Sequence, residues 1–119
     1  MTLAAVTEAL GRHRFSAATE AELQGALAEA LVAAGFDVAR EVRLSRGDRI
    51  DLMAGRVGIE VKVSGAVTDI LRQLDRYAAH GSISALLLVT TRVQHVAPIE
   101  RVAMLRGCPV KALHVGGLR

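Results

Sequence analysis

Apolar residues recur along the chain at two periods, and the switching between them predicts an α/β domain. Spacings of three and four residues are typical of amphipathic helices, and strict alternation is typical of half-buried strands. The run over 84–91 is almost continuously apolar, as in a central strand covered on both faces. The predicted helices cover 19–34, 65–80 and 98–106; the predicted strands cover 36–44, 49–53, 57–63, 84–91 and 110–115.

The resulting order is α-β-β-β-α-β-α-β. Tight turns join the first three strands, so these strands should pair antiparallel. The helix after the third strand implies a parallel neighbour reached by a right-handed crossover. We therefore expect a mixed central sheet flanked by helices. The 119 residues correspond to one domain, in which 1–18 form either a short leading helix or an arm, 19–91 form the core and 116–119 form a tail.

The strand over 57–63 and the one before it carry the candidate chemistry. A two-residue loop of Gly55 and Arg56, with Gly first, is a favoured type II′ hairpin. This loop length pairs Leu52 with Ile59 and places Asp51 opposite Glu60, on one face of the sheet. Lys62 lies two residues further along the same face.

Two opposed carboxylates repel each other, so something should offset the repulsion. Lys62 offsets part of it, and a bound Mg²⁺ or Mn²⁺ would offset more, because hard cations prefer carboxylate oxygens. Such a metal polarises a phosphoryl oxygen and lowers the pKa of bound water. Lys62 would then lie beside the attacking water or stabilise the charge that develops on the phosphorane. The competing interpretation is a surface ion pair between Glu60 and Lys62.

Composition adds a weak indication of a nucleic-acid partner. Of fifteen basic residues only Lys62 and Lys111 are lysine, so thirteen are arginine, which suits forked contacts to phosphate. Cys108 is the sole cysteine, which excludes an intrachain disulfide. The four histidines are scattered and are interpreted as surface or core residues. No apolar run is long enough for a membrane span, and we expect a soluble, cytoplasmic protein.

Asp51 followed nine residues later by Glu60-Val-Lys62, on strands that come after an acidic helix, resembles the PD-(D/E)xK nuclease superfamily. The resemblance covers residues 19–91. The chain departs from the motif at Ile50, where the name-giving proline would stand. The resemblance implies a restriction-endonuclease-like core, catalysis by Asp51, Glu60, Lys62 and Gln73, and a metal held by Asp51, Glu60 and Glu22.

Two of these implied roles have alternatives. Glu22 also completes a capping box with Thr19 as the N-cap, and this explains it equally well; Glu20 is the competing acid. Gln73 and Tyr77 resemble a Gln…Tyr pair on the helix after the Glu-x-Lys strand, but they also fit a solvated helix face. Several residues flank the site and are candidates for nucleic-acid binding: Arg43, Arg46, Arg49, Arg72, Arg76 and Tyr77.

The resemblance implies a Mg²⁺-dependent endonuclease that acts on DNA. One active site cuts one strand, so a homodimer would cut both. Small junction-resolving members suggest a Holliday-junction resolvase-like activity; restriction, repair and phage processing are alternatives. Selectivity for DNA structure, or a protein partner, would supply the specificity. The other open alternatives are a non-catalytic nucleic-acid-binding module and a nuclease-like subunit.

Overall fold

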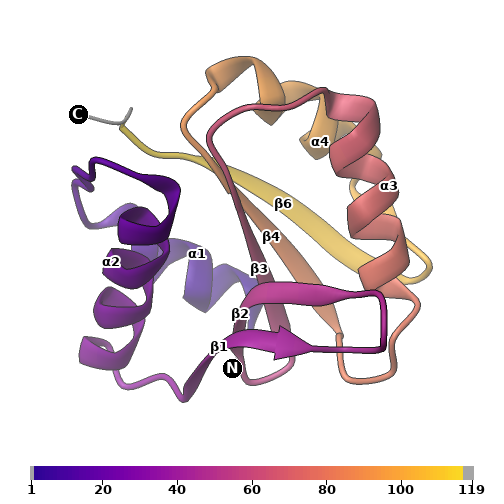
Figure 1. Ribbon diagram of the computed structural model, residues 1–119, viewed down its shortest axis with the longest axis horizontal. Helices are drawn as coiled ribbons and strands as arrows, with labels where there is room; N and C mark the ends of the chain where they lie inside the picture. Colours follow the sequence, from indigo (N-terminus) through magenta and orange to yellow (C-terminus); the bar gives the residue numbers. More distant parts are fainter. Residues whose placement is uncertain (1, 117–119) are drawn as a thin grey trace.

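The computed structural model describes residues 2–116, which form four α-helices, one 3-10 turn and a six-stranded mixed sheet (Figure 1). In order the elements are α1 (Leu3–Gly11), α2 (Glu20–Ala33), β1 (Val38–Arg43), β2 (Arg49–Ala54), β3 (Val57–Lys62), α3 (Val67–Ala78), β4 (Ala85–Thr90), η1 (Val93–His95), α4 (Val96–Val102), β5 (Met104–Leu105) and β6 (Cys108–His114). The expected mixed sheet flanked by helices is confirmed. The predicted tail falls largely on residues 117–119, which lie outside the described range.

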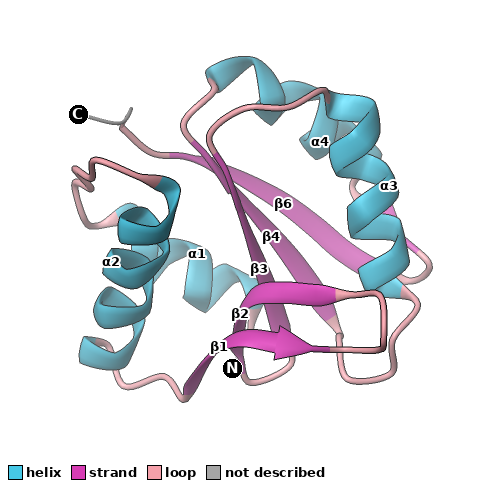
Figure 2. Cartoon of the chain, in the orientation of Figure 1, coloured by secondary structure: helices cyan, strands magenta, loops and turns pink. Residues whose placement is uncertain are grey.

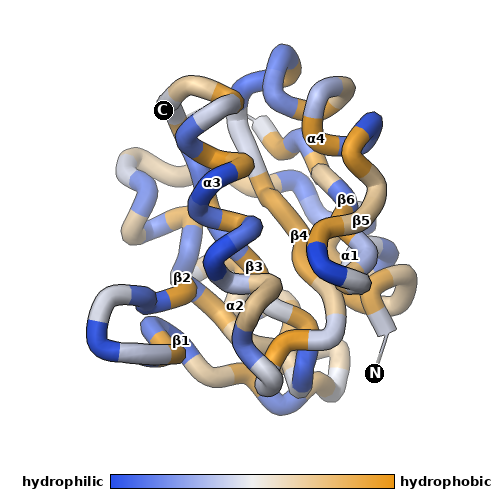
Figure 3. The backbone as a smooth tube through the Cα atoms, turned by 90° about the vertical axis from the view of Figure 1, so that its right-hand side faces the viewer, coloured by the Kyte–Doolittle hydropathy of each residue, from blue (hydrophilic) through white to orange (hydrophobic). Residues whose placement is uncertain are grey.

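The sheet has the strand order β1-β2-β3-β4-β6-β5. β1, β2 and β3 pair antiparallel, whereas β3, β4 and β6 are parallel. Helices α1 and α2 cover one face, and α3 and α4 cover the other (Figures 1 and 2). β4 is buried along its whole length, as its continuous apolar sequence predicts. In Figure 3 this strand is an apolar stripe at the centre of the molecule.

Residues 1–18 contain a helix and not an arm. Leu3, Val6 and Leu10 are the buried stripe of α1, which packs against α2 and the sheet. α2 then begins at the predicted capping box and ends as predicted at Gly35, whose φ of 93° only glycine adopts readily. No helix among the described residues is long and apolar enough to cross a membrane.

The last predicted helix is wrong in its second half. α4 ends at Val102, and Gly107, expected to stop the helix, instead belongs to a two-residue hairpin loop between β5 and β6. Arg106 and Gly107 both have positive φ, at 49° and 80°, which is the geometry of a type I′ turn. Arg106 is held there by a forked ion pair with Asp75 on α3, with distances of 3.0 and 3.1 Å. This long-range contact is absent from any local sequence pattern.

The alternation of β2 breaks at Asp51. Strict alternation would place Ile50 and Leu52 on one face of the sheet, but Leu52 packs under α2 whereas Ile50 packs on the α3 side. In the pairing of β1 with β2, Arg40 is opposite Leu52 and Val42 is opposite Ile50, but the position between them, Glu41 with Asp51, is not paired. Glu41, at this unpaired position, has a φ of 50°, which is strained for a residue with a Cβ. The distortion therefore lies next to the candidate site.

Gly58 provides the space that this distortion requires. A Cβ at Gly58 would lie 2.6 Å from Ile50 Cδ1 and 3.1 Å from Leu86 Cδ2. We expect Gly58→Ala to destabilise the protein by about 1–3 kcal/mol through overpacking, measured as a lower urea midpoint. Gly47→Ala is the matched control, because a Cβ there meets nothing within 4 Å. Equal midpoints for the two variants would contradict this account of Gly58.

Candidate active site at the split between β2 and β3

The predicted hairpin register is correct. Ala54 pairs with Val57 and Leu52 with Ile59, which leaves Gly55 and Arg56 as the two-residue loop. Gly55 has a φ of 59° and Arg56 is not among the residues with positive φ, as a type II′ turn requires. The two-residue turn therefore sets which residues of β2 and β3 approach each other.

The structure brings Asp51 and Glu60 together, but not as an opposed pair on one face of the sheet. The ladder stops at Leu52–Ile59, and side chains replace the next backbone bonds. Asp51 Oδ2 accepts a hydrogen bond from the Val61 amide at 2.8 Å, and Glu60 Oε1 accepts one from the Asp51 amide at 3.4 Å. Asp51 thus reaches across the gap toward β3, and each carboxylate satisfies a donor that the split would leave unpaired.

Lys62 and Glu60 form an ion pair at the end of β3. The distance from Lys62 Nζ to Glu60 Oε2 is 3.3 Å, and the two side chains are 25% and 5% exposed. The ion pair is therefore not the surface pair of the competing interpretation. The Glu60 carboxylate is buried, and the partly exposed Lys62 side chain lies between it and solvent.

Burial and the Asp51 charge raise the pKa of Glu60 to about 7, against the opposing effect of Lys62. Burial also raises the pKa of Asp51, while its bond from Val61 and the Lys62 charge act in the other direction. The buried Glu60 carboxylate and the half-buried Asp51 carboxylate therefore share one nearby ammonium. This excess of negative charge favours either a bound proton or a second cation.

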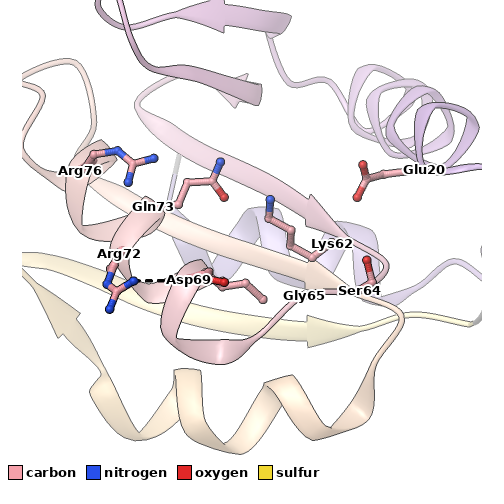
Figure 4. Close-up of a pocket in the computed structure, with 9 residues that line it drawn as sticks. Glu20, Lys62, Ser64, Gly65, Asp69, Arg72, Gln73 and Arg76 are labelled. Carbon is pink, nitrogen blue, oxygen red and sulfur yellow. Dashed lines mark hydrogen bonds and ion pairs between the residues drawn. The ribbon is translucent and has the colours of Figure 1, made fainter.

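A cavity of about 570 Å³ opens beside Lys62, between α3 and the start of α2 (Figure 4). Lys62 and Gln73 point toward each other across it, and Glu20 approaches from α2. Arg72 and Arg76 also line the cavity. Of the predicted residues, the structure therefore gathers Lys62, Gln73, Arg72 and Arg76 around one opening, next to the enclosed Glu60.

Glu22 is not among the residues that line this cavity. Its carboxylate accepts a hydrogen bond from the Ala18 amide at 2.9 Å, while its own amide donates to Thr19 Oγ1. The capping interpretation accounts for both contacts. Glu20, the competing acid, lines the cavity instead. Among residues 2–116 no three His, Cys, Asp or Glu side chains lie close enough together to hold a metal ion.

Gln24 is a site residue that the sequence did not reveal. It is buried on α2, and its Oε1 accepts a hydrogen bond from Arg40 at 3.1 Å. A hydrogen bond from its side chain also helps to lower the pKa of Asp51, against the larger effect of burial. The one feature of the sequence that could have indicated this role is a glutamine next to the apolar face of α2, because a buried side-chain amide requires hydrogen-bond partners.

Tyr77, a candidate for nucleic-acid binding with a solvated helix face as the alternative, instead belongs to the core. Its side chain is 1% exposed, and its hydroxyl donates to the Arg49 carbonyl at 2.9 Å. Burial, with the Glu60 and Asp51 charges, raises its pKa. The ring packs against Ile50 and its neighbours in the α3-side core. Tyr77 therefore holds α3 against β2 behind the carboxylates, where no nucleic acid reaches it.

The arginine candidates divide into two groups. The first consists of Arg72 and Arg76, which lie on α3 and line the cavity. Arg76 donates to Asp48 at 3.1 Å, and Asp48 also contacts His80, so the β1–β2 turn is tied to α3 beside the cavity. The hydrogen bond from His80, then that from Arg76, lower the pKa of Asp48, against the opposing effect of burial. The second group lies on the β1–β2 hairpin, exposed to solvent and outside the cavity lining: Arg43, Arg46 and Arg49.

The donor set suits a hard divalent cation. Mg²⁺ is typically bound by one or two carboxylates and keeps several waters, and Asp51 and Glu60 supply two carboxylates with too little positive charge around them.

Comparison of the chain with protein-family models, with curated proteins and with solved structures finds no match in any of the three.

Proposed function

We propose that the protein is a divalent-metal-dependent nuclease that hydrolyses DNA phosphodiester bonds, with a restriction-endonuclease-like core and a PD-(D/E)xK-type site. The observation that carries the proposal is the half-buried Asp51 beside the buried Glu60 at the β2–β3 split, with Lys62 3.3 Å from Glu60 and open to a cavity. A purely structural ion pair has no need of a second carboxylate beside the buried Glu60, because a further negative charge next to a buried one destabilises a fold.

Asp51 and Glu60 would hold Mg²⁺ or Mn²⁺, which when bound polarises the phosphate and acidifies water. Lys62 lies where it can orient the attacking water or balance the charge on the phosphoryl oxygens. Gln73 faces Lys62 across the cavity and would donate to the same phosphate. Arg72 and Arg76, one helical turn apart on α3, would bind the backbone on either side.

The two strands of a duplex require two such sites, so the proposal includes a homodimer. A Holliday-junction resolvase-like activity is the specific form proposed, with selectivity for DNA structure or guidance by a protein partner. The second candidate function is a nucleic-acid-binding module without catalysis. It is favoured by the contacts within the protein that the two carboxylates make, which are to the Val61 amide, the Asp51 amide and Lys62.

Cleavage of supercoiled plasmid and of a labelled four-way junction separates these two functions. We expect nicked or resolved products with Mg²⁺ or Mn²⁺ and none with EDTA. Asp51→Asn should bind the junction with unchanged affinity in EDTA and should not cut it with metal. A wild-type protein that binds the junction but does not cut it with either metal would exclude the nuclease and leave the binding module.

A further inference from the structure

A second cavity, of about 300 Å³, lies where the loop after α1 meets the end of β6. Its polar lining consists of His13, Arg14 and His114, and its apolar lining includes Phe15 and Val115. None of these residues takes part in the site at the β2–β3 split.

The two cavities lie along the same edge of the sheet. Lys62 on β3 is aligned with Thr90 on β4, and Thr90 is aligned with His114 on β6. Neighbouring strands are about 4.8 Å apart, so Lys62 and His114 are separated by roughly 10 Å along the edge. This edge is formed by the carboxyl ends of three parallel strands, where open α/β sheets bind their ligands. Arg92, exposed on the loop after β4, donates to the Val63 carbonyl at 2.9 Å, just beyond the end of β3.

The second cavity is positively charged. No carboxylate is among its lining residues, and within residues 2–116 Arg14 makes no ion pair. By contrast, Arg12, two residues earlier, is paired with Glu8. An unpaired guanidinium in a cavity that is also lined by two histidines favours an anion, and its forked donors match phosphate oxygens.

Two neighbouring aromatic rings, those of His13 and Phe15, also line the cavity. The rings of His13 and Phe15 lie 5.7 Å apart with a tilt of 38°, and Phe15 is fixed by packing against the core. Aromatic rings beside cationic groups are the usual means of binding unpaired nucleotides, because the base stacks while the phosphate is neutralised. The volume is at the small end of ligand sites, which suits one nucleotide and not a folded segment.

From this charge, position and shape we infer that the cavity is a second nucleic-acid subsite, which binds one unpaired nucleotide of a strand passing from the Lys62 cavity across the ends of β3, β4 and β6. Arg14 and His114 bind the phosphate, and His13 with Phe15 bind the base. The inference rests on the proposed function and narrows it: the substrate carries unpaired nucleotides close to the cleaved bond.

The test compares Arg14→Gln with Arg12→Gln, in the full chain and in EDTA so that the DNA stays intact. The ligands are a labelled blunt duplex and the same duplex with a single-stranded overhang, followed by fluorescence anisotropy. We expect Arg14→Gln to weaken binding of the overhang duplex about fivefold to tenfold. The slope of log K against log salt should also fall by about 0.7, as for one lost single-strand contact. Arg12→Gln should match the wild type on both duplexes, and Arg14→Gln should match it on the blunt duplex.

A second measurement locates the base. An overhang containing 5-iododeoxyuridine should crosslink under ultraviolet light to the peptide that contains His13 and Phe15, and Arg14→Gln should reduce the yield. Melting temperatures check that Arg14→Gln and Arg12→Gln, both at exposed positions, are folded. Equal binding by the two variants, or crosslinks only elsewhere, would overturn the subsite. Binding of inorganic phosphate that depends on Arg14, without an effect on the overhang duplex, would overturn it in favour of a free-anion site.

These outcomes separate the subsite from the proposed function. If the wild-type protein neither binds nor cuts any of the DNA substrates, the nuclease proposal fails and the subsite fails with it. If the protein cuts DNA with metal while Arg14→Gln behaves like Arg12→Gln, only the subsite is wrong.

Discussion

Replacing Lys62 by alanine is expected to lower the cleavage rate by at least 10²–10³-fold, the loss typical for removal of one preorganised charge-stabilising donor. Lys62 supplies the ammonium that pairs with the buried Glu60, and its side chain also lines the cavity that would receive the phosphate. A neutral side chain at this position leaves the attacking water and the phosphoryl oxygens without that charge. Single-turnover cleavage of the four-way junction with Mg²⁺ measures the effect.

Lys111→Ala is the matched control for this variant. Lys111 is the only other lysine in the chain, and it lies exposed on β6. The two variants lose the same charge, so a general weakening of nucleic-acid binding would affect both. We expect the Lys111 variant to cut at nearly the wild-type rate. Comparable rates for the two variants would remove Lys62 from the active site, provided that both have wild-type melting temperatures.

Replacing Glu60 by glutamine is expected to stabilise the metal-free protein at pH 8. The pKa of Glu60 is raised from 4.5 to about 7 in the folded state, chiefly by burial and then by Asp51. The folded protein therefore holds a proton that the unfolded chain releases at lower pH. The stability linked to Glu60 is fully present below pH 4.5 and is lost as the pH rises through 7.

The pKa shift corresponds to about 3 kcal/mol, as an order of magnitude, at 1.36 kcal/mol per pKa unit. A glutamine side chain has nearly the shape of Glu60 and keeps an oxygen that can accept from the Asp51 amide, but it carries no charge. Urea denaturation in EDTA at pH 5 and pH 8 tests the expectation. The wild type should be less stable at pH 8 by an amount of this size, and Glu60→Gln should show a much smaller difference.

Glu100→Gln, on the exposed side of α4, controls for a general effect of the lost charge. Added Mg²⁺ provides a further test, because a cation bound by both carboxylates stabilises the folded state by mass action. At pH 8 we expect Mg²⁺ to raise the urea midpoint of the wild type and not that of Glu60→Gln. A wild-type midpoint that does not change between pH 5 and pH 8 in EDTA would contradict the raised pKa.

The sequence by itself determined the parts of the site that depend on local geometry. The two-residue loop at Gly55 and Arg56 fixed the register of β2 on β3, because loop length sets the pairing of a hairpin. Alternation along β3 placed Glu60 and Lys62 on one face. The α2 boundaries followed from the capping box and Gly35, which satisfy the orphan backbone groups of a helix with nearby residues.

Only the tertiary structure decided which side chains meet across elements. Glu22, Glu20 and Gln24 occupy the same helix, and its rotation against the sheet directs them respectively to the cap, to the cavity and to the core beside Asp51. Tyr77, for which a solvated helix face was one alternative, lies in the core, because α3 packs it into the same cluster as Ile50 and its hydroxyl bonds to the Arg49 carbonyl. The raised pKa of Glu60 has the same origin, since burial depends on all the elements packed around a residue and not on its neighbours in the chain.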